Sequence, residues 1–189
     1  IVGTLNTKNS IGLVSVAATE NFEFEATLFS SATTEKYVGL IAAFKLPDDE
    51  NFVNGNKNLL ALQFIRTPGA ANNWFVNFQD GATVSRLQNG TSPITGYSST
   101  SGWKNVYTKI KIVRAKNIVK AYTSKFDTIA NPQPIVNSTE IIVDLNATTN
   151  TRKLLGRQRF GYFVDRQPQA SFEDIKFFGE LETNTLYCV

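Results

Sequence analysis

Residues 72–81 read NNWFVNFQDG and place four side chains at a spacing of two, namely Asn73, Phe75, Asn77 and Gln79. In a strand these side chains share one face, with neighbours about 7 Å apart. A primary amide donates and accepts hydrogen bonds, and an aromatic ring offers a flat apolar surface. Sugars present hydroxyl pairs and apolar C–H faces, so this face suits a neutral saccharide. The alternative is an exposed strand with one incidental phenylalanine.

The intervening side chains of the segment are apolar. Trp74, Val76 and Phe78 point to the opposite face of such a strand, where they can fill the space between two β layers. The odd-numbered side chains from 73 to 79 are therefore expected to open onto solvent, where a ligand can reach them.

Three further side chains are candidate ligand contacts. Tyr97 lies in the Gly- and Ser-rich stretch Gln88–Trp103, which we expect to be a long loop. Long loops in compact domains are often functional, although Trp103 itself is expected to anchor a core. Arg157 and Arg159 flank the start of a predicted strand, and a guanidinium can stack on a sugar ring or grip a phosphate. Simple solvated charge is the alternative for both arginines.

Two absences restrict the chemistry of the chain. It contains no histidine and a single cysteine, Cys188. The first absence excludes Ser-His-Asp and Cys-His catalysis and removes the commonest transition-metal ligand. The second excludes an intramolecular disulfide and a cysteine zinc site, and Cys188 is expected to be a free thiol, with an intermolecular disulfide as the alternative.

The charge and hydropathy argue against nucleic-acid partners and membrane insertion. The 19 Lys and Arg against 16 Asp and Glu give a net charge of +3, too small for a general nucleic-acid binder. The longest apolar run, Val38–Phe44, is far shorter than the roughly 20 residues of a membrane-spanning helix. From Lys104 to Arg166 there are 12 basic and 4 acidic residues. This excess indicates either solvated strand faces or a surface that meets an anionic polymer.

Strand patterns separated by Asn-, Gly-, Ser- and Pro-rich turns run along the whole chain. In Asn21–Ser30 apolar and polar residues alternate, which is typical of a half-buried antiparallel strand, whereas Lys36–Leu46 is apolar on both faces and should be central. The best short helix candidate is Thr151–Gly156, with a turn as the alternative. The predicted strands are Ile11–Ala17, Asn21–Ser30, Lys36–Leu46, Asn58–Arg66, Asn72–Gln79, Val106–Arg114, Asn117–Ser124, Glu140–Leu145, Arg159–Asp165 and Ser171–Phe178.

Many antiparallel strands without crossover helices predict an all-β fold, an antiparallel two-sheet jelly-roll sandwich. No change of composition marks a second domain, so residues 1–189 are expected to form one carbohydrate-binding-type domain. The chain begins Ile-Val-Gly without methionine, which favours a fragment of a longer protein.

Two stretches resemble the second half of concanavalin A-like, laminin-G-like sandwich domains. In Trp103–Ser124 a tryptophan precedes a strand, a tight turn and a second strand. Residues 141–145 and 160–179 read IIVDL and FGYFVDRQPQASFEDIKFFG, with Gly161–Phe163 and Phe172–Ile175 in the places of the closing strands. The resemblance implies a curved jelly roll that often binds glycan, although fold alone does not grant that function.

The resemblance also bears on catalysis and on metal binding. Hydrolases of this group carry a Glu-x-Asp-x-x-Glu cluster, whereas the nearest pattern in this chain, Glu23-Phe-Glu25, lacks the third acid. We therefore expect no enzyme activity, with a carboxylate pair from distant strands left as an alternative. No cofactor is expected, although a structural calcium is possible. Its candidate ligands are the acidic segment Asp48–Glu50 with Asn51 and Asn54, or Glu20, Asn21 or Asp174 near the first and last strands.

The Asn-rich, His-free, Met-free and helix-poor character is similar to that of accessory sugar-binding modules on phage baseplates and tails. The resemblance implies a non-catalytic module that recognises a cell-wall or cell-surface polysaccharide, at a virion surface or outside the cell. Display in several copies on a larger assembly would then strengthen weak binding at each site. A structural or protein-interaction domain of a virion or surface protein is the alternative, and a glycoside hydrolase or lyase is the second alternative.

Overall fold

A computed structural model describes residues 2–3, 10–13, 19–30, 37–45, 60–66, 73–81, 83–91, 106–123, 141–165 and 170–179. These residues form twelve strands and one short helix. The elements are β1 (Val2–Gly3), β2 (Ser10–Leu13), β3 (Asn21–Ser30), β4 (Tyr37–Lys45), β5 (Leu60–Arg66), β6 (Asn73–Asp80), β7 (Thr83–Thr91), β8 (Val106–Ala115), β9 (Ile118–Thr123), β10 (Ile141–Asp144), α1 (Thr149–Arg152), β11 (Arg159–Asp165) and β12 (Ala170–Gly179).

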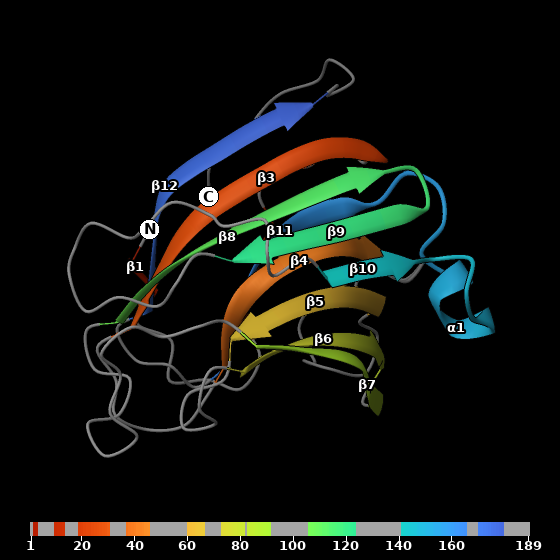
Figure 1. Cartoon of the computed structure of the whole chain (residues 1–189), viewed down its shortest axis with the longest axis horizontal. Coiled ribbons are helices and arrows are strands. Elements are labelled where there is room, and N and C mark those ends of the chain that lie inside the picture. Colours follow the sequence, from red (N-terminus) through yellow and green to blue (C-terminus); the bar gives the residue numbers. More distant parts are fainter. Residues whose placement is uncertain are drawn as a thin grey trace.

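The strands form two six-stranded antiparallel sheets that pack face to face (Figure 1). The β3 sheet has the order β1-β12-β3-β8-β9-β10, and the β4 sheet has the order β2-β11-β4-β5-β6-β7. In Figure 1, β8 and β9 pass in front of β11 and β4, and α1 lies at one end of the sandwich. The long run β4-β5-β6-β7 is a meander, because each of its strands pairs with the next along the chain.

The predicted alternation places the core correctly. Phe22, Phe24 and Leu28 of β3 and Ile110 and Ile112 of β8 are all buried in one hydrophobic cluster. Side chains from the inner face of the β4 sheet complete this cluster. The apolar strand β4 lies between β11 and β5, which confirms that it is central to its sheet.

Four aromatic rings join the two sheets. Phe160 of β11 is 1% exposed and lies with its ring centroid 4.6 Å from that of Phe22 and 5.2 Å from that of Phe24. It also stacks on Phe177 of β12 at 4.9 Å. Because Phe160 belongs to the β4 sheet and its three neighbours to the β3 sheet, this cluster holds the layers together.

A buried arginine anchors the segment between β10 and β11. Arg114, at the end of β8, is 1% exposed, and its Nη2 donates to the carbonyl oxygens of Leu154 at 3.1 Å and Gly156 at 2.5 Å. Its Nε donates to the carbonyl of Lys116 at 3.1 Å, and its Nη1 is buried without a partner. Burial lowers the pKa of the Arg114 guanidinium to about 10, an effect that the charge of Glu20 partly opposes.

The structure differs from the sequence expectation at three elements. β7 was not predicted, and Gln88–Thr91, expected to begin a loop, belongs to this strand. β1 was not predicted either. The helix is α1, which begins two residues before the predicted one and ends at Arg152, because Thr148 caps it and bonds Thr151 reciprocally. No helix in the described part of the chain is long and apolar enough to span a bilayer.

The edges of the two sheets are linked on one side of the sandwich. β7 ends the β4 sheet and β10 ends the β3 sheet. Gln88 Nε2 donates a 2.6 Å hydrogen bond to the carbonyl oxygen of Ile142. The side chain of one edge strand therefore occupies a backbone acceptor of the other.

Candidate functional site

β6 has the predicted orientation, but the two described side chains of its outer face are not open to solvent. Val76 and Phe78 are buried in the core, as expected. Asn77 and Gln79 point to the other face, yet they are only 9% and 3% exposed, so the expectation of solvent-exposed amides is wrong for these two residues. The side chains of Asn73 and Phe75 lie outside the described residues.

The amides of β6 belong to a cluster of three with Gln63 of β5, which is 1% exposed and lies opposite Asn77 in the strand register. Gln63 Nε2 donates to Gln79 Oε1 at 2.8 Å, and Gln79 Nε2 donates to the carbonyl oxygen of Gly81 at 2.9 Å. We call Gln63, Asn77 and Gln79 the amide cluster. The bond between the two glutamines and the bond to Gly81 fix the rotamers of Gln63 and Gln79.

Asn77 leaves one acceptor of the amide cluster unused. Its Oδ1 is buried and has no hydrogen-bond partner in the structure. An unpaired buried acceptor costs about 1–3 kcal/mol, and such atoms are rare in native proteins and call for an explanation. Exposure rises across the cluster from Gln63 to Asn77, and Arg86 of β7, which pairs with Asn77 in the register, is exposed. The cluster therefore reaches the surface beside Asn77 and Arg86.

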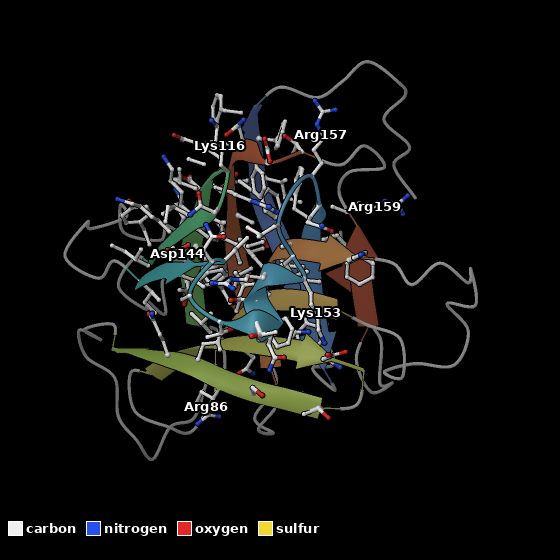
Figure 2. All side chains as sticks on the ribbon, turned by 90° about the vertical axis from the view of Figure 1, so that its right-hand side faces the viewer. Arg86, Lys116, Asp144, Lys153, Arg157 and Arg159 are labelled. Carbon is white, nitrogen blue, oxygen red and sulfur yellow. The ribbon has the colours of Figure 1, made fainter. Side chains whose placement is uncertain are left out.

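The register also places Arg159 on this outer face. Arg159 of β11 pairs with Phe44 of β4, Phe44 pairs with Ala61 of β5, and Ala61 pairs with Gln79. Residues paired across a sheet share a face, so Arg159 and Gln79 lie in one row, about 14 Å apart over three strand spacings. Figure 2 shows Arg86 and Arg159 projecting from the sandwich at separate places. These two arginines therefore do not meet at one place.

Of the remaining predicted ligand contacts, the structure describes Arg157 but not Tyr97. Arg157 is exposed in the connection between α1 and β11, at the end of the molecule that Figure 2 faces. Tyr97 lies outside the described residues, as do Trp103 and Cys188. The assignment of Asn73, Phe75, Asn77, Gln79, Tyr97, Arg157 and Arg159 to ligand binding stays a prediction.

Two members of this face were missed in the sequence. Gln63 is a lone amide within the apolar strand LALQFIR, which is a signal that could have been read. Arg86 lies in a strand that was itself not predicted. Gln63 meets Gln79 across sixteen positions of the chain, so no local pattern could reveal their contact.

The described basic residues between positions 104 and 166 do not form one patch. Lys109 and Lys111 lie 3.6 and 2.5 Å from glutamates of β3 on the outer face of the β3 sheet. Lys153 Nζ lies 2.6 Å from Asp80, and Arg114 is buried. Solvated or paired charge therefore accounts for most of this excess among the described residues.

No cluster of three or more Asp, Glu, His or Cys side chains suited to a metal ion occurs among the described residues. Asn21 Oδ1 accepts a hydrogen bond from the backbone nitrogen of Lys116 at 3.2 Å. Glu20 is half-buried, and Asp174 is exposed at an irregularity of β12. The acidic segment 48–54 lies outside the described residues, and calcium binding stays a prediction.

An open depression of about 360 Å³ lies on the opposite side of the molecule, on the outer face of the β3 sheet. Its lining includes the apolar or aromatic side chains of Val113, Ile118 and Tyr122 and the charged side chains of Glu23 and Lys120. Apolar contacts and both signs of charge therefore meet on this face.

Comparison with known proteins identifies the architecture. No model of a protein family matches the chain, and no curated protein matches it in sequence. The carbohydrate-binding module CBM66 from Bacillus subtilis superposes with a TM-score of 0.58 at 12% identity, over 92% of this chain and 83% of that one.

Two animal lectins are similar at a lower level. Sheep galectin-11, solved in complex with glycerol, gives a TM-score of 0.46 at 6% identity over 93% of this chain and 100% of that one. CG-16, a homodimeric agglutinin from chicken liver, gives 0.46 at 12% identity over 90% and 100%. The strand order and the likeness to the bacterial module confirm the predicted fold, an antiparallel two-sheet jelly-roll sandwich of the concanavalin A-like kind.

Proposed function

We propose that this protein is a non-catalytic carbohydrate-binding module whose saccharide site is the outer face of the β4 sheet at the amide cluster. The observation that carries the proposal is the buried Oδ1 of Asn77, which has no hydrogen-bond partner although two preorganised amides lie beside it. A sugar hydroxyl is a donor of the right kind for this acceptor. The unpaired acceptor is then a feature of the binding site whose cost is recovered when a ligand binds.

The roles of the residues follow from their contacts. Asn77 Oδ1 accepts a hydroxyl proton, while Gln63 and Gln79 hold each other and shape the site. Arg86 lies beside Asn77 at the exposed margin and can donate several hydrogen bonds to hydroxyl oxygens. The ligand approaches from the side of β7, because exposure is greatest there.

The likeness to the bacterial module supports this proposal only through the shared fold. Carbohydrate binding is stated in the name of that protein and is not thereby shown for this chain. A jelly roll by itself does not determine function. A host cell wall as the source of the saccharide and a phage tail as the parent assembly stay predictions to which the fold adds nothing. Lack of catalysis likewise stays a prediction.

Replacing Asn77 with alanine tests the proposal directly. We expect the dissociation constant for a bound polysaccharide to rise by about tenfold, the value of one hydrogen bond near 1.4 kcal/mol. The variant should unfold at the same urea concentration as the wild type or at a higher one, since the substitution removes an unsatisfied buried acceptor. A glycan array identifies the ligand, and calorimetric titration measures the affinity.

The matched control is Asn150→Ala, an equivalent change at an exposed position of α1. It should leave binding unchanged. Undiminished affinity of the Asn77→Ala variant would remove the amide cluster from the binding site. A wild-type chain that binds no polysaccharide would favour a structural or protein-interaction domain.

A further inference from the structure

One cross-strand row on the outer face of the β3 sheet alternates apolar and charged side chains. Phe178 of β12 pairs with Glu23 of β3, and Glu23 pairs with Val113 of β8. Val113 pairs with Lys120 of β9, and Lys120 pairs with Ile142 of β10. The charged row therefore reads apolar, acidic, apolar, basic, apolar over about 19 Å, four strand spacings.

The charged row lies on an accessible surface. Phe178 is 64% exposed and Ile142 is 45% exposed, whereas most large apolar side chains of the described chain are buried. Between them lies the open depression that Glu23, Val113 and Lys120 help to line. Figure 1 shows the strands that carry the row as the layer nearest the viewer. These two exposed apolar side chains can add buried area to a contact that is made across the row.

The order of the charged row makes it complementary to itself. A two-fold axis lying in the contact plane and running along β8 places the row against a reversed copy. Glu23 then faces Lys120 of the partner subunit, and Phe178 faces Ile142 of the partner subunit. Val113 lies on the axis and meets its own counterpart. A two-fold contact repeats each of these pairs, so two acid–base contacts and two apolar contacts form together.

We propose that the outer face of the β3 sheet binds a second copy of this chain, forming a face-to-face dimer through the charged row. Sheets pack face to face with their strands within about 30° of each other, which this arrangement allows. The apolar pairs supply buried area, and the charge pairs set the register and exclude other alignments. Lys111, in the next row, also lies near the axis, and its 2.5 Å ion pair with Glu23 reduces repulsion from its counterpart.

The dimer is independent of the proposed saccharide site, because it uses the opposite face of the molecule. If both hold, the two amide clusters point away from each other. Such a dimer can bridge two glycan surfaces. Both sites could bind one extended glycan surface only if the glycan chains were flexible enough to reach both sides of the dimer.

A charge-reversal exchange tests the dimer. Analytical ultracentrifugation of the wild-type chain should give twice the 20.9 kDa chain mass. Glu23→Lys places lysine against lysine twice, and Lys120→Glu places glutamate against glutamate twice, so each variant alone should dimerise about tenfold more weakly or worse. An equimolar mixture of the two variants restores both acid–base contacts in a heterodimer, and the dimer should reappear.

Controls separate this contact from folding. Lys45→Glu makes the same charge change on an exposed residue of β4 and should leave the dimer intact. Phe178→Ser removes an apolar end of the row and adds no charge beside Glu23, so it covers the case in which Glu23→Lys fails to fold. A wild-type chain that is monomeric at concentrations on the order of 1 mM overturns the proposal. A dimer that survives both single reversals, or that the mixture fails to restore, overturns it as well.

Discussion

Replacing Phe160 with alanine is expected to lower the free energy of unfolding by about 3–5 kcal/mol, the range for a buried phenylalanine. The ring is 1% exposed and lies within 5.2 Å, centroid to centroid, of three other phenylalanine rings, two on β3 and one on β12. Truncation removes the transfer free energy of the ring and leaves a cavity between the two sheets. Because domains have only about 5–15 kcal/mol of stability, this single change removes a large share.

Urea unfolding followed by tryptophan fluorescence measures the effect of Phe160→Ala as a shift of the midpoint. Phe178→Ala is the matched control, since this ring is 64% exposed on the other side of β12. In dilute solution it should change stability by less than about 0.5 kcal/mol. Similar losses in both variants would contradict the view that the inter-sheet ring cluster stabilises the sandwich.

The second large effect is expected at Arg114, whose replacement by alanine should cost about 2–4 kcal/mol. The substitution removes the donors that now bind the carbonyl oxygens of Lys116, Leu154 and Gly156, and it empties a buried volume. Opposing this loss, burial of the charged guanidinium is itself unfavourable, and the same burial lowers its pKa to about 10. The carbonyl bonds should dominate, since one of them is fully buried and water cannot easily replace its donor.

Arg114→Met separates the two contributions. Methionine fills most of the space of the arginine stem but donates no hydrogen bond. We expect the methionine variant to lose some free energy of unfolding relative to the wild type, but less than the alanine variant loses. Hydrogen exchange should become faster for the backbone amides of residues 145–158. A methionine variant as stable as the wild type would show that the carbonyl bonds only balance the burial of the charge.

The strands that could be predicted are those in which apolar residues mark one face. β3 and β11 have the predicted bounds, because Asn21–Ser30 and Arg159–Asp165 carry strong apolar patterns. β7 reads TVSRLQNGT and carries few apolar residues, and it is an edge strand that buries little. Its pairing with β6 comes from the meander rather than from its own pattern, so the sequence offered no local signal.

The candidate site was predictable in its chemistry but not in its environment. The spacing of Asn77 and Gln79 gave their shared face, since that depends only on the period of a strand. Their burial and the contact with Gln63 depend on which strand lies alongside and on what surrounds the sheet. Arg114 shows the same limit. Its two-residue spacing from the buried Ile112 and Ile110 favours the core face of the strand, whereas its charge favours the surface.

The hydrogen bond from Gln88 to Ile142 protects one sheet edge against pairing with strands of other chains. An edge strand with unpaired carbonyl and amide groups can form backbone hydrogen bonds with a strand of another chain. Such pairing is the first step toward fibrils. Here the side-chain amide of Gln88 already donates to one of the carbonyl oxygens of β10 that a strand of another chain would need. The flank where the two layers meet is thereby made a poor seed for cross-β polymer, with no lysine or proline required in the strand itself.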